Sequence, residues 1–274
     1  EKTSIREALL QRDIAASERD ELKKQMEQME ATIDELKTAE LEVLDKIKTL
    51  SNKELDKIKG IFSSVNVALK RKNMYFNAMA NSKRKDSKGG PYVPLKIKLD
   101  DPRIEDKVSA IFKSVDDIEY YREVMLSVPL GKPVWSYWVT SRYGTRSDPF
   151  KKTKARHKGV DLASRTGNKV NVKGQGKVIR AEYAGAYGNL VVVDHGNGFQ
   201  TKYAHLNKIY VKKGDRLEIN DTVGEVGSTG RSTGPHLHYE VLYKGVNVDP
   251  LPFLKAKILS LIHISEPTRP LYIS

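Results

Sequence analysis

The first third of the chain carries a regular spacing of hydrophobic residues. Apolar side chains recur at alternating steps of four and three between residues 22 and 50, with Glu40 filling one position of the series. The members are Leu22, Met26, Met29, Ile33, Leu36, Val43, Ile47 and Leu50. The intervening positions are mostly polar, and neither Gly nor Pro occurs before Gly60, so we interpret residues 1–80 as a helical region with a heptad stripe. The stripe is buried in a coiled coil, in a helical hairpin or against the following domain, and the sequence leaves these alternatives open.

A second, shorter helix is predicted at about residues 102–127. Residues 82–91 are rich in Ser, Lys and Gly, which indicates a solvated loop, and Asp101-Pro102 is typical of a helix start. An apolar stripe follows, consisting of Ile104, Val108, Ile111, Phe112, Val115 and Ile118. We therefore interpret residues 81–133 as a linker plus this helix, which either connects two domains or packs on the next one and restrains it.

From about Val134 the pattern changes to short β-rich runs separated by Gly-containing turns. The runs are residues 135–140, 170–172, 177–182, 190–194, 201–205, 222–226 and 237–242. Strands at this spacing favour an antiparallel domain, which we place at residues 134–252. The predicted fold class is therefore α+β and multidomain, with a long helix or coiled coil before a mainly antiparallel β domain.

Residues 253–274 are interpreted as a C-terminal tail. Within it, residues 259–269 read LSLIHISEPTR and resemble the translation of an adapter used to prepare DNA for sequencing. We interpret this stretch as a cloning or sequencing artefact and keep His263 out of any site.

Charge and composition narrow the function classes. The chain has 48 Lys and Arg, 35 Asp and Glu, and a net charge of +13, which suggests an anionic partner. The absence of Cys excludes disulfides, thiolate catalysis and Cys-ligated metal sites. No recognisable nucleic-acid-binding module accompanies the positive charge, so we expect no nucleic acid partner. No apolar run is long enough to span a membrane. The start at Glu1 leaves room for an upstream anchor, and we expect membrane attachment only through such an anchor.

The histidines give the sharpest chemical signal. Five of the six lie between residues 157 and 238. His236 and His238 share one face if they lie on a strand, and the even spacing of His157 and Asp161 permits the same in an extended segment. Imidazoles with one carboxylate and no thiol suit zinc with an open coordination position, as in hydrolytic sites.

Three segments together carry a resemblance to a known family. Residues 157–163, 203–206 and 234–240 read HKGVDLA, YAHL and GPHLHYE, and the match extends over about residues 134–251. This pattern resembles the lysostaphin/LytM-type zinc endopeptidases of bacterial cell walls. The resemblance implies a LytM-like β-sandwich or roll for the β domain, with one Zn2+ per catalytic domain.

The resemblance also implies a role for individual residues. His157, Asp161 and His238 would be the zinc ligands. His205 and His236 would be the catalytic residues that exchange protons or stabilise the transition-state oxyanion, and the sequence does not say which does which.

Further positions match the family less specifically. Asn189 and Tyr203 correspond to residues that line the substrate groove in the family. The alternative is that Asn189 only forms a turn and Tyr203 only fills the sheet. His195 lies in an HGNG turn and is interpreted as structural.

The implied function is a cell-wall zinc metalloendopeptidase, with a zinc-bound water as nucleophile. Its substrate would be an amide bond in the stem peptides or cross-links of peptidoglycan, and by analogy a D,D bond. The alternative is a non-enzymatic or weakly enzymatic coiled-coil regulator of envelope remodelling, such as an amidase activator. Expected partners are peptidoglycan and either a coiled-coil homo-oligomer or an envelope protein. The expected location is the bacterial cell envelope, in the periplasm, with an inner-membrane anchor as an option for the full-length protein.

Overall fold

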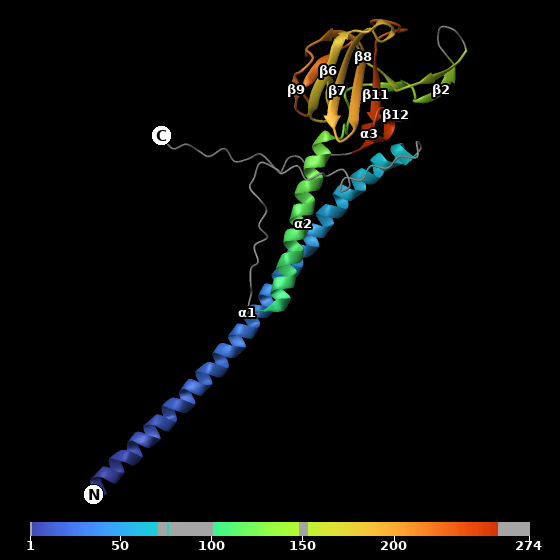
Figure 1. Ribbon diagram of the computed structural model, residues 1–274. Helices are drawn as coiled ribbons and strands as arrows, with labels where there is room; N and C mark the ends of the chain where they lie inside the picture. Colours follow the sequence, from blue (N-terminus) through green and yellow to red (C-terminus); the bar gives the residue numbers. More distant parts are fainter. Residues whose placement is uncertain (1, 71–75, 77–100, 148–152, 257–274) are drawn as a thin grey trace, which may run out of the picture. The chain divides into compact units, whose positions relative to one another are not determined.

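The computed structural model describes residues 2–70, 76, 101–147 and 153–256. Two long helices, α1 (Lys2–Lys70) and α2 (Pro102–Ser127), precede a β domain (Figure 1). A long N-terminal helix before a mainly antiparallel β domain was the predicted fold, and it is confirmed. The artefact predicted at 259–269 and the end of the tail lie outside the described residues. Within the described residues, neither long helix has a stretch apolar enough to cross a membrane.

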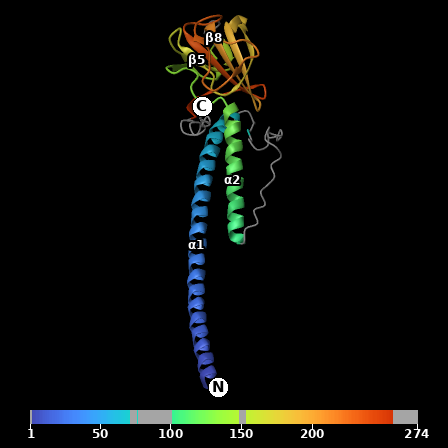
Figure 2. The same cartoon turned by 90° about the vertical axis from the view of Figure 1, so that its left-hand side faces the viewer.

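The β domain is built on one large antiparallel sheet. Seven of its strands run in the order β1-β4-β11-β8-β7-β6-β9, while β10 pairs with both β5 and β8, and β12 pairs with β11. A separate ribbon is formed by β2 and β3, and the large sheet is strongly curved (Figure 2). The strands are β1 (Trp138–Ser141), β2 (Gly144–Ser147), β3 (Lys154–His157), β4 (Val160–Ala163), β5 (Lys169–Asn171), β6 (Gly176–Tyr183), β7 (Asn189–Gly196), β8 (Phe199–Ile209), β9 (Arg216–Leu217), β10 (Thr222–Val226), β11 (His236–Tyr243) and β12 (Val246–Val248). Two short helices complete the domain, a 3-10 turn η1 (Gly185–Tyr187) and α3 (Leu251–Lys255).

The described part of the chain forms two compact units, and the predicted boundaries at 80/81 and 133/134 stay predictions. One compact unit holds α1 up to Lys53 with α2 up to Val115, and the other holds the rest of both helices with the β domain. In the second unit, α1 buries five apolar residues at alternating steps of three and four: Leu55, Ile58, Phe62, Val65 and Leu69. This stripe joins the same hydrophobic core as the sheet. The C-terminal part of α1 is therefore part of the β unit rather than of a separate helical region.

Phe76 connects this part of α1 with the sheet. Its side chain is 2% exposed, and its ring lies 5.6 Å from the Phe62 ring and 5.1 Å from the Phe199 ring, measured between centroids. Asn66 fixes the Phe76 backbone, because its Oδ1 accepts from Phe76 N–H at 2.8 Å and its Nδ2 donates to Phe76 O at 3.1 Å. These contacts anchor Phe76 against the β domain.

In the first unit, α2 begins as its sequence signal predicted. Pro102 occupies the first helical position, and the Asp101 carboxylate accepts a hydrogen bond from Arg103 N–H at 2.9 Å, which caps the helix. Lys107 on α2 pairs with Asp45 on α1. The heptad residues of α1 from Leu22 to Leu50 stay 41–66% exposed in this single chain.

Candidate metal centre and groove

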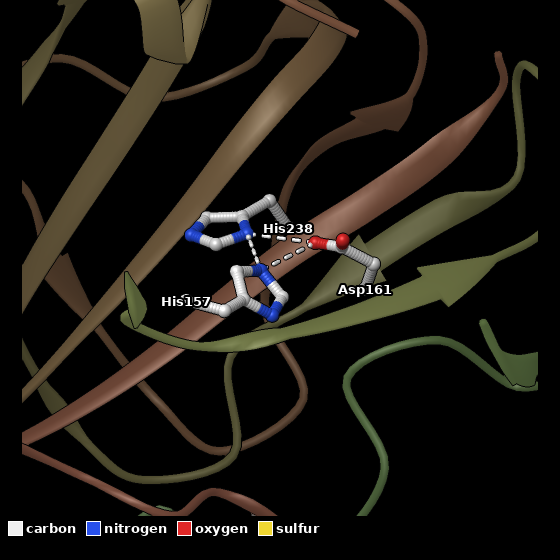
Figure 3. A group of neighbouring side chains, drawn as sticks. All are labelled: His157, Asp161 and His238. Carbon is white, nitrogen blue, oxygen red and sulfur yellow. Dashed lines mark hydrogen bonds and ion pairs between the residues drawn. The ribbon is translucent and has the colours of Figure 1, made fainter. Parts of the chain in front are cut away.

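Three side chains from three strands converge on one point. His157 ends β3 and Asp161 lies in β4, while His238 of β11 is the register partner of Asp161. Directly opposite residues of antiparallel strands point to the same face of a sheet, so Asp161 and His238 meet (Figure 3). Asp161 Oδ1 lies 3.0 Å from His157 Nε2 and 2.8 Å from His238 Nδ1, and the two nitrogens are 3.1 Å apart. All three residues are buried.

In His157 and His238, the ring nitrogen that does not face Asp161 makes a hydrogen bond of its own. His157 Nδ1 donates to the carbonyl of Arg142 at 2.9 Å, which leaves Nε2 free of a proton when the ring is neutral. His238 Nε2 donates to the carboxylate of Glu240 at 3.1 Å, which leaves Nδ1 free in the same way. Metal-bound histidines are characteristically fixed by such outer hydrogen bonds.

The spacing of the three atoms fits a small tetrahedral metal ion. Zinc holds His and carboxylate ligands at about 2.0–2.2 Å, so tetrahedral ligand atoms lie roughly 3.3–3.5 Å apart. The observed separations of 2.8–3.1 Å need to widen by only a few tenths of an ångström. His157, Asp161 and His238 could therefore hold a metal ion. Their role as zinc ligands, which the resemblance implies, stays a prediction.

Charge in this cluster is concentrated on two buried carboxylates. Burial raises the pKa of Asp161, but its hydrogen bonds with His157 and His238 lower it more, so the pKa is held well below its usual range. Burial likewise raises the pKa of Glu240, while the hydrogen bond from His238 and the charge of Lys202 lower it to about 2. The pKa of His238 is raised, because hydrogen bonds to the two carboxylates outweigh its burial. Both carboxylates are therefore ionised at neutral pH.

Glu240 lies beneath His238 in a fully satisfied network. Its side chain is 0% exposed. Oε1 accepts from His238 Nε2 and from the Tyr187 hydroxyl at 2.8 Å, and Oε2 accepts from Asn247 Nδ2 at 2.9 Å and from Lys202 Nζ at 3.1 Å. This network fixes the ring orientation that directs His238 Nδ1 toward Asp161.

His205 reaches the site through a local irregularity of β8. Tyr203 of β8 pairs with Val191, whereas Leu206 pairs with Asn189, so β8 contains one more residue than β7 over this stretch. His205 adopts a φ of 60°, in the left-handed region. The bulge and this φ turn its side chain toward the groove rather than into the core.

His205 and His236 lie beside the three-residue cluster. Their ring centroids are 4.8 Å apart, and His236 Nε2 is 3.7 Å from Asp161 Oδ1. Each ring donates from Nδ1 to a backbone carbonyl, His205 to Thr229 at 2.8 Å and His236 to Gly234 at 2.7 Å. Burial lowers the pKa of His205 to about 4, so its Nε2 is an unprotonated acceptor at neutral pH.

An open groove of about 510 Å³ surrounds these residues. Its cationic lining side chains are Arg146, Arg156, Lys158 and Arg231. Among the described residues, no part of α1 or α2 lines it.

The two predicted substrate contacts lie in different surroundings. Asn189 is half-buried and donates from Nδ2 to the carbonyls of Leu206 and Asn207. Tyr203 is fully buried, with its ring 5.4 Å from that of Tyr239. Neither is among the groove-lining residues. A substrate-binding role stays a prediction for both, and for Tyr203 its burial in the core gives that role no support.

Sequence reasoning missed the roles of Glu240, Tyr187 and Arg146. Glu240 had a readable signal, because it follows His238 by two residues on a strand and therefore shares its face. Arg146 and Tyr187 approach from the β2–β3 ribbon and from η1, and no sequence spacing relates either of them to His238.

Comparisons with known proteins identify relatives of the β domain. Residues 155–250 match the model of Peptidase family M23. The peptidoglycan DD-endopeptidase ShyA of Vibrio cholerae is 41% identical over 128 residues, which are 46% of this chain and 29% of ShyA. The DD-carboxypeptidase/endopeptidase Mpg of Neisseria meningitidis is 40% identical over 113 residues, which are 41% of this chain and 26% of Mpg.

Solved structures include a related domain. The catalytic domain of the antimicrobial peptidase lysostaphin from Staphylococcus simulans shares 32% identity, with a TM-score of 0.41 and coverage of 43% of this chain and 92% of that domain. The present chain spans less than a third of the length of ShyA or of Mpg. Within the β domain, residues 155–250 therefore form a segment that matches Peptidase family M23.

Proposed function

We propose that this chain is a cell-wall zinc metalloendopeptidase that hydrolyses amide bonds in the stem peptides or cross-links of peptidoglycan. The observation that carries the proposal is the complete set of His157, Asp161 and His238, flanked by the Nε2 atoms of His205 and His236. The relatives named as DD-endopeptidases support a D,D bond as the substrate.

Each residue has a defined part in this proposal. His157, Asp161 and His238 hold the zinc, which would polarise the scissile carbonyl and acidify an attacking water. His205 is neutral at neutral pH and can accept a proton at Nε2, and it or His236 returns a proton to the leaving amine. The open groove admits an extended peptide over the three ligands.

The alternative of a non-enzymatic regulator is not favoured. A regulator that only docks an amidase requires neither a complete ligand set nor two imidazoles beside it. The exposed heptad residues of α1 support a further role in association, either with a second copy or with an envelope protein. A peptidoglycan substrate places the protein in the cell envelope, and we propose the periplasm.

Digestion of purified, cross-linked peptidoglycan tests this function. Mass analysis of the released fragments should show conversion of cross-linked dimers to monomers by the natural chain. Asp161→Ala and His205→Ala should each abolish the conversion, the first with loss of bound zinc and the second with zinc retained. Conversion at the natural rate by Asp161→Ala would refute the assigned site.

A further inference from the structure

Among the described residues, Arg146 is the arginine whose guanidinium pairs with a member of the ligand cluster. In the β2–β3 ribbon, Gly144 pairs with His157 and Arg146 pairs with Ala155. Because alternate residues of a strand share a face, Arg146 lies on the same face of the ribbon as His157. Its guanidinium is 3.4 Å from Asp161 Oδ2, the carboxylate oxygen that does not face the two histidines.

Arg146 retains hydrogen-bonding capacity toward the groove. Its side chain is 35% exposed and lines the groove. A guanidinium has five N–H donors in a planar fork that matches a carboxylate. The contact with Asp161 is single and long, so the other edge of the fork can bind a second anion.

The surrounding charges favour an anionic ligand at this place. Among the described residues, the carboxylates that line the groove are Asp161 and Glu240. Asp161 belongs to the proposed metal site, and Glu240 is paired with Lys202 and His238 behind it. The four Lys and Arg side chains among the described lining residues outnumber these two carboxylates, so the local field attracts carboxylates.

On the basis of the proposed hydrolase function, we propose that Arg146 binds a carboxylate carried by the carbon next to the scissile nitrogen. In a substrate whose scissile carbonyl lies at the ligand cluster, this carbon is bonded directly to the scissile nitrogen. Arg146 contacts Asp161 of the cluster and is therefore positioned to bind the carboxylate.

Two peptidoglycan bonds have this chemistry. One is the cross-link from D-alanine to the D-centre of diaminopimelate, whose carboxylate is free. The other is the terminal D-alanyl–D-alanine bond of an uncross-linked stem peptide. An internal bond of a glycine bridge has no carboxylate at this position. Arg146 thus selects the first two substrate classes against the third.

The test compares matched peptides that differ only in this carboxylate. Cross-linked dimers and D-alanyl–D-alanine stem peptides are prepared with the carboxylate free or amidated, and kcat/KM and the dissociation constant are measured with the zinc-loaded protein. The natural chain should prefer the free acids by about 10–100-fold, the size expected for a charge-assisted hydrogen bond. Cleavage of the dimer or of the stem peptide identifies which of the two sources is used.

Three variants isolate Arg146. Arg146→Ala should lose the preference, so that the acid and the amide are cleaved and bound equally, and Arg146→Lys should restore part of it. The control is Lys154→Gln, which removes one positive charge from the same ribbon outside the groove lining and should keep the natural preference.

The outcomes separate this inference from the proposed function. Equal cleavage and equal binding of acid and amide by the natural chain would overturn the carboxylate subsite while leaving the hydrolase intact. Acid-selective binding that depends on Arg146, without any cleavage, would support the subsite and refute the hydrolase. A loss of zinc in Arg146→Ala with an equal loss of activity on both peptides would show that Arg146 only orients Asp161, which also overturns the inference.

Discussion

The buried carboxylate of Glu240 should control how tightly the chain holds zinc. Glu240→Gln keeps the side-chain shape but replaces one acceptor oxygen with an NH2 group. Each carboxylate oxygen accepts two hydrogen bonds, so the amide nitrogen must face two donors that it cannot satisfy. His238 also loses the negative charge that fixes its ring and strengthens its basicity.

The expected magnitude follows from these contacts. Loss of a hydrogen-bond partner of a metal ligand weakens metal binding by about 10–100-fold, or ~1.4–2.7 kcal/mol. Two unsatisfied buried donors should in addition lower the free energy of unfolding by roughly 2–5 kcal/mol. Both effects should appear in the same variant, because one carboxylate supplies both sets of contacts.

Competition with a chromophoric chelator measures the zinc affinity, and circular dichroism verifies that the variant is folded. Tyr187→Phe removes one donor without touching the Glu240–His238 bond and should change zinc affinity less than Glu240→Gln. Glu225→Gln alters a half-buried glutamate that accepts a hydrogen bond from Asn207 and does not line the groove, and it should have no effect on zinc affinity. Natural zinc affinity in a folded Glu240→Gln protein would refute the positioning role.

Three further results are expected. His195 is buried with Nδ1 donating to Gln175 O and Nε2 accepting from Thr201, and burial lowers its pKa below the ordinary 6.5. The neutral His195 ring therefore contributes stability above pH 6.5 that is lost as the pH falls. Between about pH 7.5 and about pH 5, the free energy of urea unfolding should fall more steeply for the natural chain than for His195→Gln. Equal dependence on pH in the two proteins would contradict this. Phe76→Ala should lower the free energy of unfolding by about 3–5 kcal/mol in the same assay, and a loss under ~1 kcal/mol would show that the Phe76 ring does not contribute to the core. Met29→Lys combined with Leu36→Lys should convert a self-associated chain to a monomer in sedimentation, whereas a natural chain that is itself monomeric would contradict the homo-oligomer prediction.

The helices and most strands could be predicted because their patterns are local. The shorter helix was predicted at about 102–127, where α2 spans Pro102–Ser127. The strand predicted at 237–242 corresponds to β11, at His236–Tyr243. The ribbon of β2 and β3 was not predicted, because its short strands are largely polar and lack an alternating apolar signal.

The convergence at the site depended on features that the sequence shows only in part. His236 and His238 share a face by simple alternation, as expected. His205 would point into the core by the same rule, and the bulge that turns it outward has no signal in the spacing of residues. Resemblance rather than spacing therefore placed His205 beside the cluster.

The division of α1 between two compact units could not be predicted from the sequence either. Its apolar stripe from Leu55 to Leu69 has the same three-and-four spacing as the stripe from Leu22 to Leu50. Periodicity shows that a helix has a face to bury, but it does not say what covers that face. Only the structure shows that the later stripe packs in the core of the β unit.

Restoration of activity by metal in a single sample tests the central claim most directly. The natural chain is stripped with a chelator, dialysed and incubated with cross-linked peptidoglycan before and after one equivalent of zinc is added. We predict no conversion of dimers to monomers by the stripped protein, full conversion once zinc is restored, and no conversion at any zinc concentration by His238→Ala. Equal conversion by the stripped and the zinc-restored protein would contradict a zinc-dependent peptidase.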